Sequence, residues 1–150
     1  METRTIHEKL QGIQSSLKAP KGQTNKFGGY SYRSAEDILT AVKPLLRENG
    51  CTLVISDDIV GVEGRVYVKA TAVLAESGSD YSIQVNGFAR ESETRKGMDD
   101  SQITGSASSY ARKYALNGLF AIDDTKDADA TNDHGKSKQN RTEVDTIFEL

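Results

Sequence analysis

Apolar residues near the start of the chain recur at the spacing of an amphipathic helix. Separations of four, three and four residues place four side chains on one stripe of a helix that ends before Pro20: Ile6, Leu10, Ile13 and Leu17. The residues at 18–26 are mostly polar and predict an exposed loop, which leads into a short aromatic segment with a glycine hinge at 27–33. The apolar stripe needs another element to cover it.

A second helix is predicted to begin after Ser34. Ser34 is a favourable helix cap, and Asp37, three positions later, comes close to completing a capping box. The apolar face of this helix comprises Ile38, Val42, Leu45 and Leu46. Gly50 is suited to the position just after the helix, whereas Pro44 is expected to bend or split it.

Beyond Gly50 the apolar period changes to two, which is typical of strands. Short turns at 63–64 and 77–79 separate the predicted strands, which are Thr52 to Ser56, Ile59 to Val62, Arg65 to Ala75 and Tyr81 to Arg90. These strands form an antiparallel meander. In the third of them one face suits a core, with Val66, Val68, Ala70, Ala72 and Leu74. The other face suits solvent or a polyanion, with Arg65, Tyr67, Lys69 and Thr71.

A third helix is predicted after a polar loop at 91–98. Asp99 or Asp100 caps it, and it runs to about Asn117 with Gly118 as its stop. Its apolar face comprises Ile103, Ala107, Tyr110 and Tyr114, which we interpret mainly as packing residues. A different, polar face comprises Gln102, Ser106, Ser109 and Lys113.

The composition divides the chain into a folded domain at 1–122 and an acidic, flexible tail at 123–150. The tail holds eight acidic and four basic side chains, which leaves 14 acidic and 15 basic side chains in the domain. The tail therefore carries a net charge of −4 and the domain +1, and a near-neutral domain can still carry a basic groove.

Several function classes find no support in the sequence. There is no apolar run long enough for a membrane helix and no signal peptide at the start, so we expect a cytoplasmic protein. Cys51 is the single cysteine and the two histidines lie far apart, which argues against a disulfide and a metal centre. Neither a phosphate-binding glycine loop nor a nucleophile elbow occurs, so we expect no cofactor and no ATP.

The aspartates at 123–133 suggest a calcium loop, but the pattern fails in detail. Counting from Asp127 places Asn132 where the turn glycine should stand and Lys138 where the last acidic ligand should stand. A solvated acidic linker is the better interpretation.

Cations and aromatic residues occur together in two places. Arg112 and Lys113 stand beside the two tyrosines of the third helix, and Tyr30-Ser-Tyr-Arg33 repeats the combination. Aromatic rings stack on unpaired bases and cations neutralise phosphates, so the combination fits single-stranded DNA. Five residues extend a possible basic track: Arg65, Lys69, Arg90, Arg95 and Lys96. Spacing alone equally allows an ordinary core helix with solvated charges.

Taken together, the motifs resemble those of the ERF (essential recombination function) family of phage single-strand annealing proteins. The resemblance covers roughly residues 5–130. It rests on Tyr30-Ser-Tyr-Arg33, on Val42-Lys-Pro-Leu-Leu46 with Gly50, and above all on Gly105-Ser-Ala-Ser-Ser-Tyr-Ala-Arg-Lys-Tyr-Ala-Leu116 with Leu119-Phe120 and the acidic run.

The resemblance implies an ATP-independent recombinase that coats single-stranded DNA, assembles into rings or filaments and pairs complementary strands. It also implies an α+β fold with a β-β-β-α core similar to that of eukaryotic strand-annealing mediators, which agrees with the predicted meander and helix. Family members commonly continue into a longer C-terminal region that contacts host replication proteins, and here only the tail to Leu150 follows.

The expected DNA-binding residues are Tyr30, Tyr32, Arg33, Arg65, Lys69, Arg90, Arg95, Lys96, Arg112 and Lys113. The expected partners are single-stranded DNA, the annealed duplex, further copies of the chain and a host replication or single-strand-binding protein, within a bacterial cytoplasm. The alternative function is a protein-interaction module that binds a host repressor or replication protein. We expect no enzyme, because a nuclease needs clustered carboxylates inside the fold and the obvious cluster lies in the tail.

Overall fold

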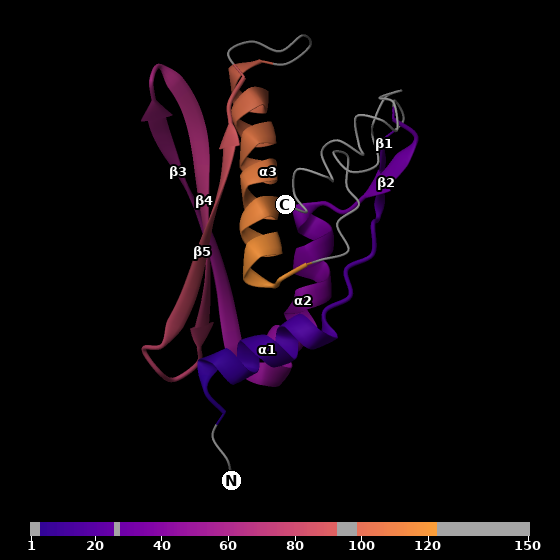
Figure 1. The fold of residues 1–150 in the computed structure, drawn as a ribbon, viewed down its shortest axis with the longest axis vertical. Helices are drawn as coiled ribbons and strands as arrows, with labels where there is room; N and C mark the ends of the chain where they lie inside the picture. The colour runs from indigo at the N-terminus through magenta and orange to yellow at the C-terminus, as the bar shows by residue number, and fades with distance from the viewer. Residues whose placement is uncertain (1–3, 26–27, 93–98, 123–150) are drawn as a thin grey trace, which may run out of the picture.

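The computed structural model describes residues 4–25, 28–92 and 99–122, and it has the predicted α+β fold (Figure 1). The elements in chain order are α1 (Ile6–Ser16), β1 (Gln23–Asn25), β2 (Tyr30–Tyr32), α2 (Ala35–Asn49), β3 (Cys51–Val62), β4 (Arg65–Glu76), β5 (Ser82–Arg90) and α3 (Asp100–Leu119). In the part of the chain that is described, no helix is long and apolar enough to cross a membrane.

Each of these helices begins with a capping box. The side chains of Thr5, Ser34 and Asp99 each accept a hydrogen bond from the backbone three residues on, and the side chain there returns one to the cap. At its other end α2 stops at Gly50, whose φ of 64° lies in the left-handed region that glycine adopts without strain.

Pro44 does not split α2, which runs unbroken to Asn49. A proline lacks the N–H that would bond the carbonyl four residues earlier, at Thr40. Thr40 and Pro44 both lie on the exposed side of α2, so water can satisfy the carbonyl that is left without a helical partner.

The predicted meander is confirmed as a three-stranded antiparallel sheet in the order β3-β4-β5. The two segments predicted at 52–56 and 59–62 are one continuous strand, because Asp57 and Asp58 between them also pair with β4. A separate hairpin, in which β1 pairs with β2, was not predicted and forms within the loop and aromatic segment.

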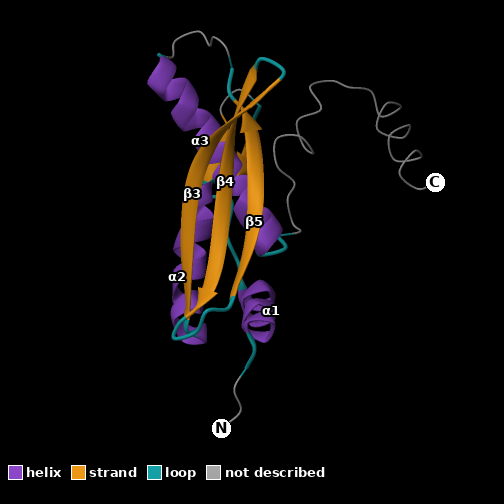
Figure 2. Cartoon of the chain, turned by 90° about the vertical axis from the view of Figure 1, so that its left-hand side faces the viewer, coloured by secondary structure: helices purple, strands orange, loops and turns teal. Residues whose placement is uncertain are grey.

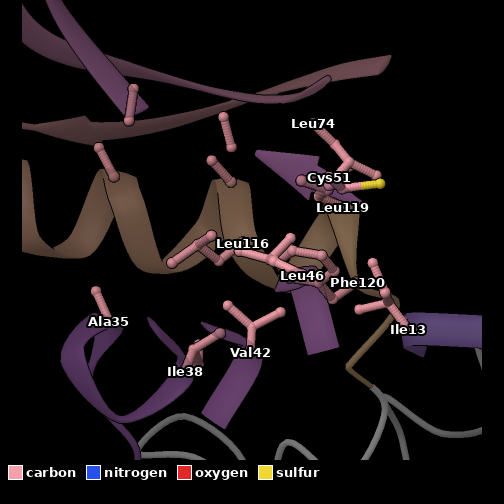
Figure 3. Packing of buried hydrophobic residues seen from close by; sticks show 14 of the residues in the cluster. Ile13, Ala35, Ile38, Val42, Leu46, Cys51, Leu74, Leu116, Leu119 and Phe120 are labelled. Carbon is pink, nitrogen blue, oxygen red and sulfur yellow. The ribbon is translucent and has the colours of Figure 1, made fainter. Parts of the chain in front are cut away.

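The core lies between the sheet, α3 and α2. One face of the sheet is covered by α3, and α2 lies on the far side of α3 (Figures 1 and 2). The stripe of α1 is covered by the same core, with Ile13 fully buried beside Phe120 (Figure 3). On β4 the predicted core face is confirmed from Val68 to Leu74, whereas Val66, beside the turn, is exposed.

Gly87 of β5 allows α3 to lie directly on the sheet. A Cβ atom at this position would collide with the carbonyl oxygen of Ala111 and, at 2.5 Å, with the backbone nitrogen of Ala115. Ala111 and Ala115 are themselves fully buried, so the helix and the strand meet through small residues on both sides. The distance between α3 and the sheet is therefore set by these residues.

Two predictions about α3 are wrong. The helix does not stop at Gly118 but continues to Leu119, and a Cβ at Gly118 would stand 3.0 Å from the Val85 side chain, so this glycine serves close packing on β5. Tyr110 and Tyr114 are not packing residues, since they are 50% and 42% exposed. The sheet and α2 both contact α3, so the buried side of this helix differs from the predicted one. It includes Ala107, Ala111, Ala115, Leu116 and Leu119.

Candidate nucleic-acid interface

The β1–β2 hairpin presents two tyrosines on one face. Tyr30 and Tyr32 alternate with the exposed Ser31, and their ring centroids are 6.2 Å apart at an interplanar angle of 57°. The Tyr30 hydroxyl accepts a 2.8 Å hydrogen bond from the Asn25 side chain across the hairpin. A three-residue strand pair is marginal by itself, so this bond and the contact of Tyr32 with α3 help to hold the hairpin in place.

Lys113 points from α3 toward this hairpin. Its ammonium nitrogen lies 5.7 Å from the centroid of the Tyr32 ring, within the range of a cation–π interaction. The residue is only 8% exposed, although sequence spacing placed it on a polar, solvated face. The burial arises because the hairpin and the start of α2 pack over this side of α3.

Arg33 is also buried, with 4% of its surface exposed. Its Nε donates a 2.8 Å hydrogen bond to the carbonyl oxygen of Ala19 and so ties the end of β2 to the loop after α1. The sequence predicted that Arg33 contacts a phosphate directly. In the structure its guanidinium is less accessible to DNA than that of a surface arginine.

A cavity of about 250 Å³ opens between the hairpin, the first turn of α2 and α3. Its lining joins two motifs that are distant in the sequence, through Tyr32 and Arg33 of the first and Ser106, Ser109, Tyr110 and Lys113 of the second, and it is completed by Ser34, Ala35 and Glu36. Backbone N–H groups at a helix start carry partial positive charge, and Lys113 and Arg33 add two cations, against the single carboxylate of Glu36. The cavity thus combines an aromatic wall with a predominantly positive one.

Tyr110 and Tyr114 form an exposed aromatic ridge along α3 beside this cavity. Their ring centroids are 6.3 Å apart at an interplanar angle of 28°, a near-parallel arrangement. The spacing of four residues predicted that they share a face, but it could not show that the face is open to solvent. The buried alanines Ala111 and Ala115 are the sequence signal that the sheet lies on another side.

Arg112 faces β3, about one quarter of a turn away from Lys113. Its Nε and Nη2 donate hydrogen bonds of 3.1 and 3.2 Å to the two carboxylate oxygens of Asp57, and the Ser108 hydroxyl donates to the same carboxylate. Burial pushes the pKa of Asp57 upward, but the hydrogen bonds from Arg112 and Ser108 and the guanidinium charge outweigh it, so this pKa lies below its usual range. No motif in the sequence predicted these contacts of Asp57.

The remaining predicted residues do not join this surface. Arg65, Lys69 and Arg90 lie on the face of the sheet that points away from α3. Arg95 and Lys96 lie outside the described residues. The expected basic track is therefore not one continuous surface in the described part of the chain.

Metal chemistry has no candidate centre among the residues that the structure describes, since no three His, Cys, Asp or Glu side chains gather there. The aspartate run at 123–133 lies outside those residues. Cys51 is buried, and burial raises the pKa of its thiol, which keeps the thiol protonated and unreactive.

Comparisons with known proteins agree with the resemblance seen in the motifs. A family model described as the ERF superfamily matches residues 6–146. The chain is 54% identical over 138 residues to the Essential recombination function protein of Salmonella phage P22. This alignment covers 92% of the chain but only 64% of that relative, so the chain spans slightly less than two-thirds of the relative's length. No solved structure matches the chain.

Proposed function

Because the chain belongs to the ERF superfamily, we propose that it binds single-stranded DNA and anneals complementary strands in phage homologous recombination, without ATP and as an oligomer. The observation that carries the proposal is the exposed Tyr110–Tyr114 ridge beside the cavity that holds Tyr32 and Lys113. Exposing two large aromatic rings side by side to water is unfavourable in free energy, and stacking of bases on the rings would offset this.

The ridge and the cavity have separate roles in this proposal. Bases stack on Tyr110 and Tyr114, while the phosphate backbone follows the cavity, where Lys113 and the first turn of α2 provide positive charge. Tyr32 holds the Lys113 ammonium at the cavity wall, and Arg33 anchors the hairpin through Ala19. Tyr30 supports the hairpin, and Arg95 and Lys96, which precede α3 in the sequence, add further phosphate contacts.

Annealing in this scheme requires no catalytic group. Stacking engages the faces of the bases and leaves their pairing edges open, so a complementary strand can test them directly. Holding the strand extended also removes hairpins that slow the search for complementarity.

The proposal is tested by replacing both ridge tyrosines, Tyr110→Ala with Tyr114→Ala. Stacking is worth about 1–3 kcal/mol per base, so affinity for a short oligothymidylate should fall at least tenfold. The salt dependence should stay the same, because the phosphate contacts remain. Fluorescence anisotropy at two salt concentrations measures both quantities.

Tyr81→Ala is the matched control, because Tyr81 is strongly exposed but lies beside the β4–β5 turn. Its affinity should equal that of the wild-type chain. Equal affinity in the ridge variant would overturn the role of the ridge. Absence of DNA binding by the wild-type chain would favour the protein-interaction module instead.

Oligomeric assembly is the second part of the proposal. Near the start of α3 Gly105 is exposed, and a side chain added there would meet no atom within 4 Å. A second copy could approach this segment closely. Light scattering that finds only monomers, with and without single-stranded DNA, would contradict assembly.

A further inference from the structure

The face of the sheet that points away from α3 is covered by no element among the described residues (Figure 2). Strand register determines which side chains share it. On β3 they are Thr52, Val54, Ser56, Asp58, Val60 and Val62, on β4 Arg65, Tyr67, Lys69, Thr71, Val73 and Ala75, and on β5 Ser82, Gln84, Asn86, Phe88 and Arg90. We call this surface the outer face.

Cations and aromatic rings gather at one end of the outer face. Tyr67 pairs directly with Arg90 across the two strands, and Lys69 pairs directly with Phe88. The four side chains therefore alternate, aromatic and cationic, in both directions on neighbouring strands. Phe88 is 51% exposed, so its ring is available from solvent.

The other end of the outer face is uncharged and mixes polar side chains with apolar ones, among them Val73 and the 59% exposed Val54. Thr71 and Asn86 hydrogen-bond to each other there at 2.8 Å, with Ser56, Gln84 and Ser82 nearby in the register. Over the whole face the strands carry three cations, with Arg65 as the third, and one carboxylate, Asp58, which pairs with Lys69 from the β3 side. The outer face thus has a net positive charge concentrated around two rings.

This pattern matches single-stranded nucleic acid better than a protein partner. Aromatic rings between cations allow bases to stack while phosphates are neutralised. Diagonal neighbours such as Tyr67 and Phe88 stand about 7–8 Å apart, roughly twice the rise of stacked DNA, which suits an extended strand. Protein interfaces, in contrast, are depleted of lysine, whereas Lys69 stands here between the two rings.

The helix that carries Tyr110 and Tyr114, α3, lies on the opposite side of the sheet from the outer face (Figures 1 and 2). A strand held along the ridge leaves the outer face unoccupied, and annealing involves two strands. We propose that the outer face, centred on Tyr67, Lys69, Phe88 and Arg90, binds a second single strand of DNA. This inference rests on the proposed function, because it concerns the second strand of the same reaction.

The test separates capture of the second strand from binding of the first. The wild-type chain is saturated with a donor-labelled oligonucleotide, and an acceptor-labelled oligonucleotide that is not complementary to it is then added. Energy transfer reports a complex that holds both strands. Lys69→Ala with Arg90→Ala should keep first-strand affinity within twofold and reduce second-strand capture, and the rate of annealing complementary strands, at least tenfold.

Lys43→Ala with Arg47→Ala is the charge-matched control, because it removes two exposed cations from α2. It should change neither quantity more than twofold. If Lys69→Ala with Arg90→Ala is unfolded at the assay temperature, Phe88→Ala provides the same discrimination, since it removes only a half-exposed ring.

Three results would overturn the inference. Unchanged capture of the second strand removes the outer face from the reaction. An equal loss of first- and second-strand binding makes the face part of the first site. A change in oligomeric state by light scattering makes it an interface between copies. Failure of the wild-type chain to bind any single strand would instead overturn the proposed function itself.

Discussion

The two faces of β4 belong to one strand, yet they differ in almost every property. Val68, Ala70, Ala72 and Leu74 face α3 and are at most 1% exposed, whereas Tyr67, Lys69, Thr71 and Val73 alternate with them and stay in partial contact with solvent. The period of two in the sequence therefore separates a face that is needed for folding from a face that is available for binding.

The covered face is also the simpler of the two. Its residues are small or aliphatic because α3 approaches the sheet closely. This approach is possible because Gly87 has no Cβ atom. The outer face mixes rings, cations and hydroxyl groups, which a dry core could not accommodate without hydrogen-bond partners. Substitutions on one face at a time can therefore test whether the covered face determines stability and the outer face determines binding.

The largest expected effect on stability is at the covered face. Leu74 is fully buried and points toward the C-terminal end of α3 (Figure 3), so Leu74→Ala removes apolar contacts and leaves a cavity. It should lower the free energy of unfolding by about 2–5 kcal/mol. Val73→Ala, one residue away on the outer face, should cost about 1 kcal/mol or less. Urea unfolding of both variants measures the difference, and equal losses would mean that the outer face is covered in solution.

A somewhat smaller effect is expected where α3 touches β5. In Gly87→Ala the new Cβ would collide with backbone atoms of Ala111 and Ala115, which cannot rotate away as a side chain can. Shifting the helix should cost about 1–3 kcal/mol. Gly61→Ala is the matched control, because a Cβ at Gly61 meets nothing within 4 Å. Thermal melts should show a lower Tm for Gly87→Ala alone, and a shared decrease would point to strand flexibility as the cause.

Local patterns predicted the elements of this fold well because their signals are local. A capping side chain acts on an N–H group three residues away, as at Ser34 and Asp99, and strand alternation needs no knowledge of the partner strand. The turn at Gly64 is likewise a local signal, because it joins two strands that are adjacent in the sequence, β3 and β4. The order of helices and the antiparallel meander followed from these features.

The environment of the candidate site was harder to predict because it depends on distant partners. Lys113 is buried by a hairpin some 80 residues earlier in the sequence, a separation that helical spacing does not address. Tyr110 and Tyr114 share a face as predicted, but the position of the sheet determines whether that face is buried. Asp57 gains its partners Arg112 and Ser108 only when β3 packs against α3, so no local motif could predict this interaction.

The smallest expected effect concerns Asp57, which joins the sheet to α3 by way of Arg112 and Ser108. Because the pKa of Asp57 is lowered in the folded chain, its contribution to stability is complete above the unfolded carboxyl pKa of about 3.9 and is lost as the pH falls through the lower, folded value. The pair is partly exposed to solvent, so we expect only about 0.5–1 kcal/mol. Asp57→Asn should lower the Tm at pH 7, and the difference from the wild-type chain should narrow toward pH 2.

Asp58→Asn is the matched control, because Asp58 is the neighbouring carboxylate, lies on the outer face and does not bond α3 as Asp57 does. This variant should change the Tm less at pH 7. A difference for Asp57→Asn that is the same at both pH values would show that the charge of Asp57 does not hold α3 on the sheet.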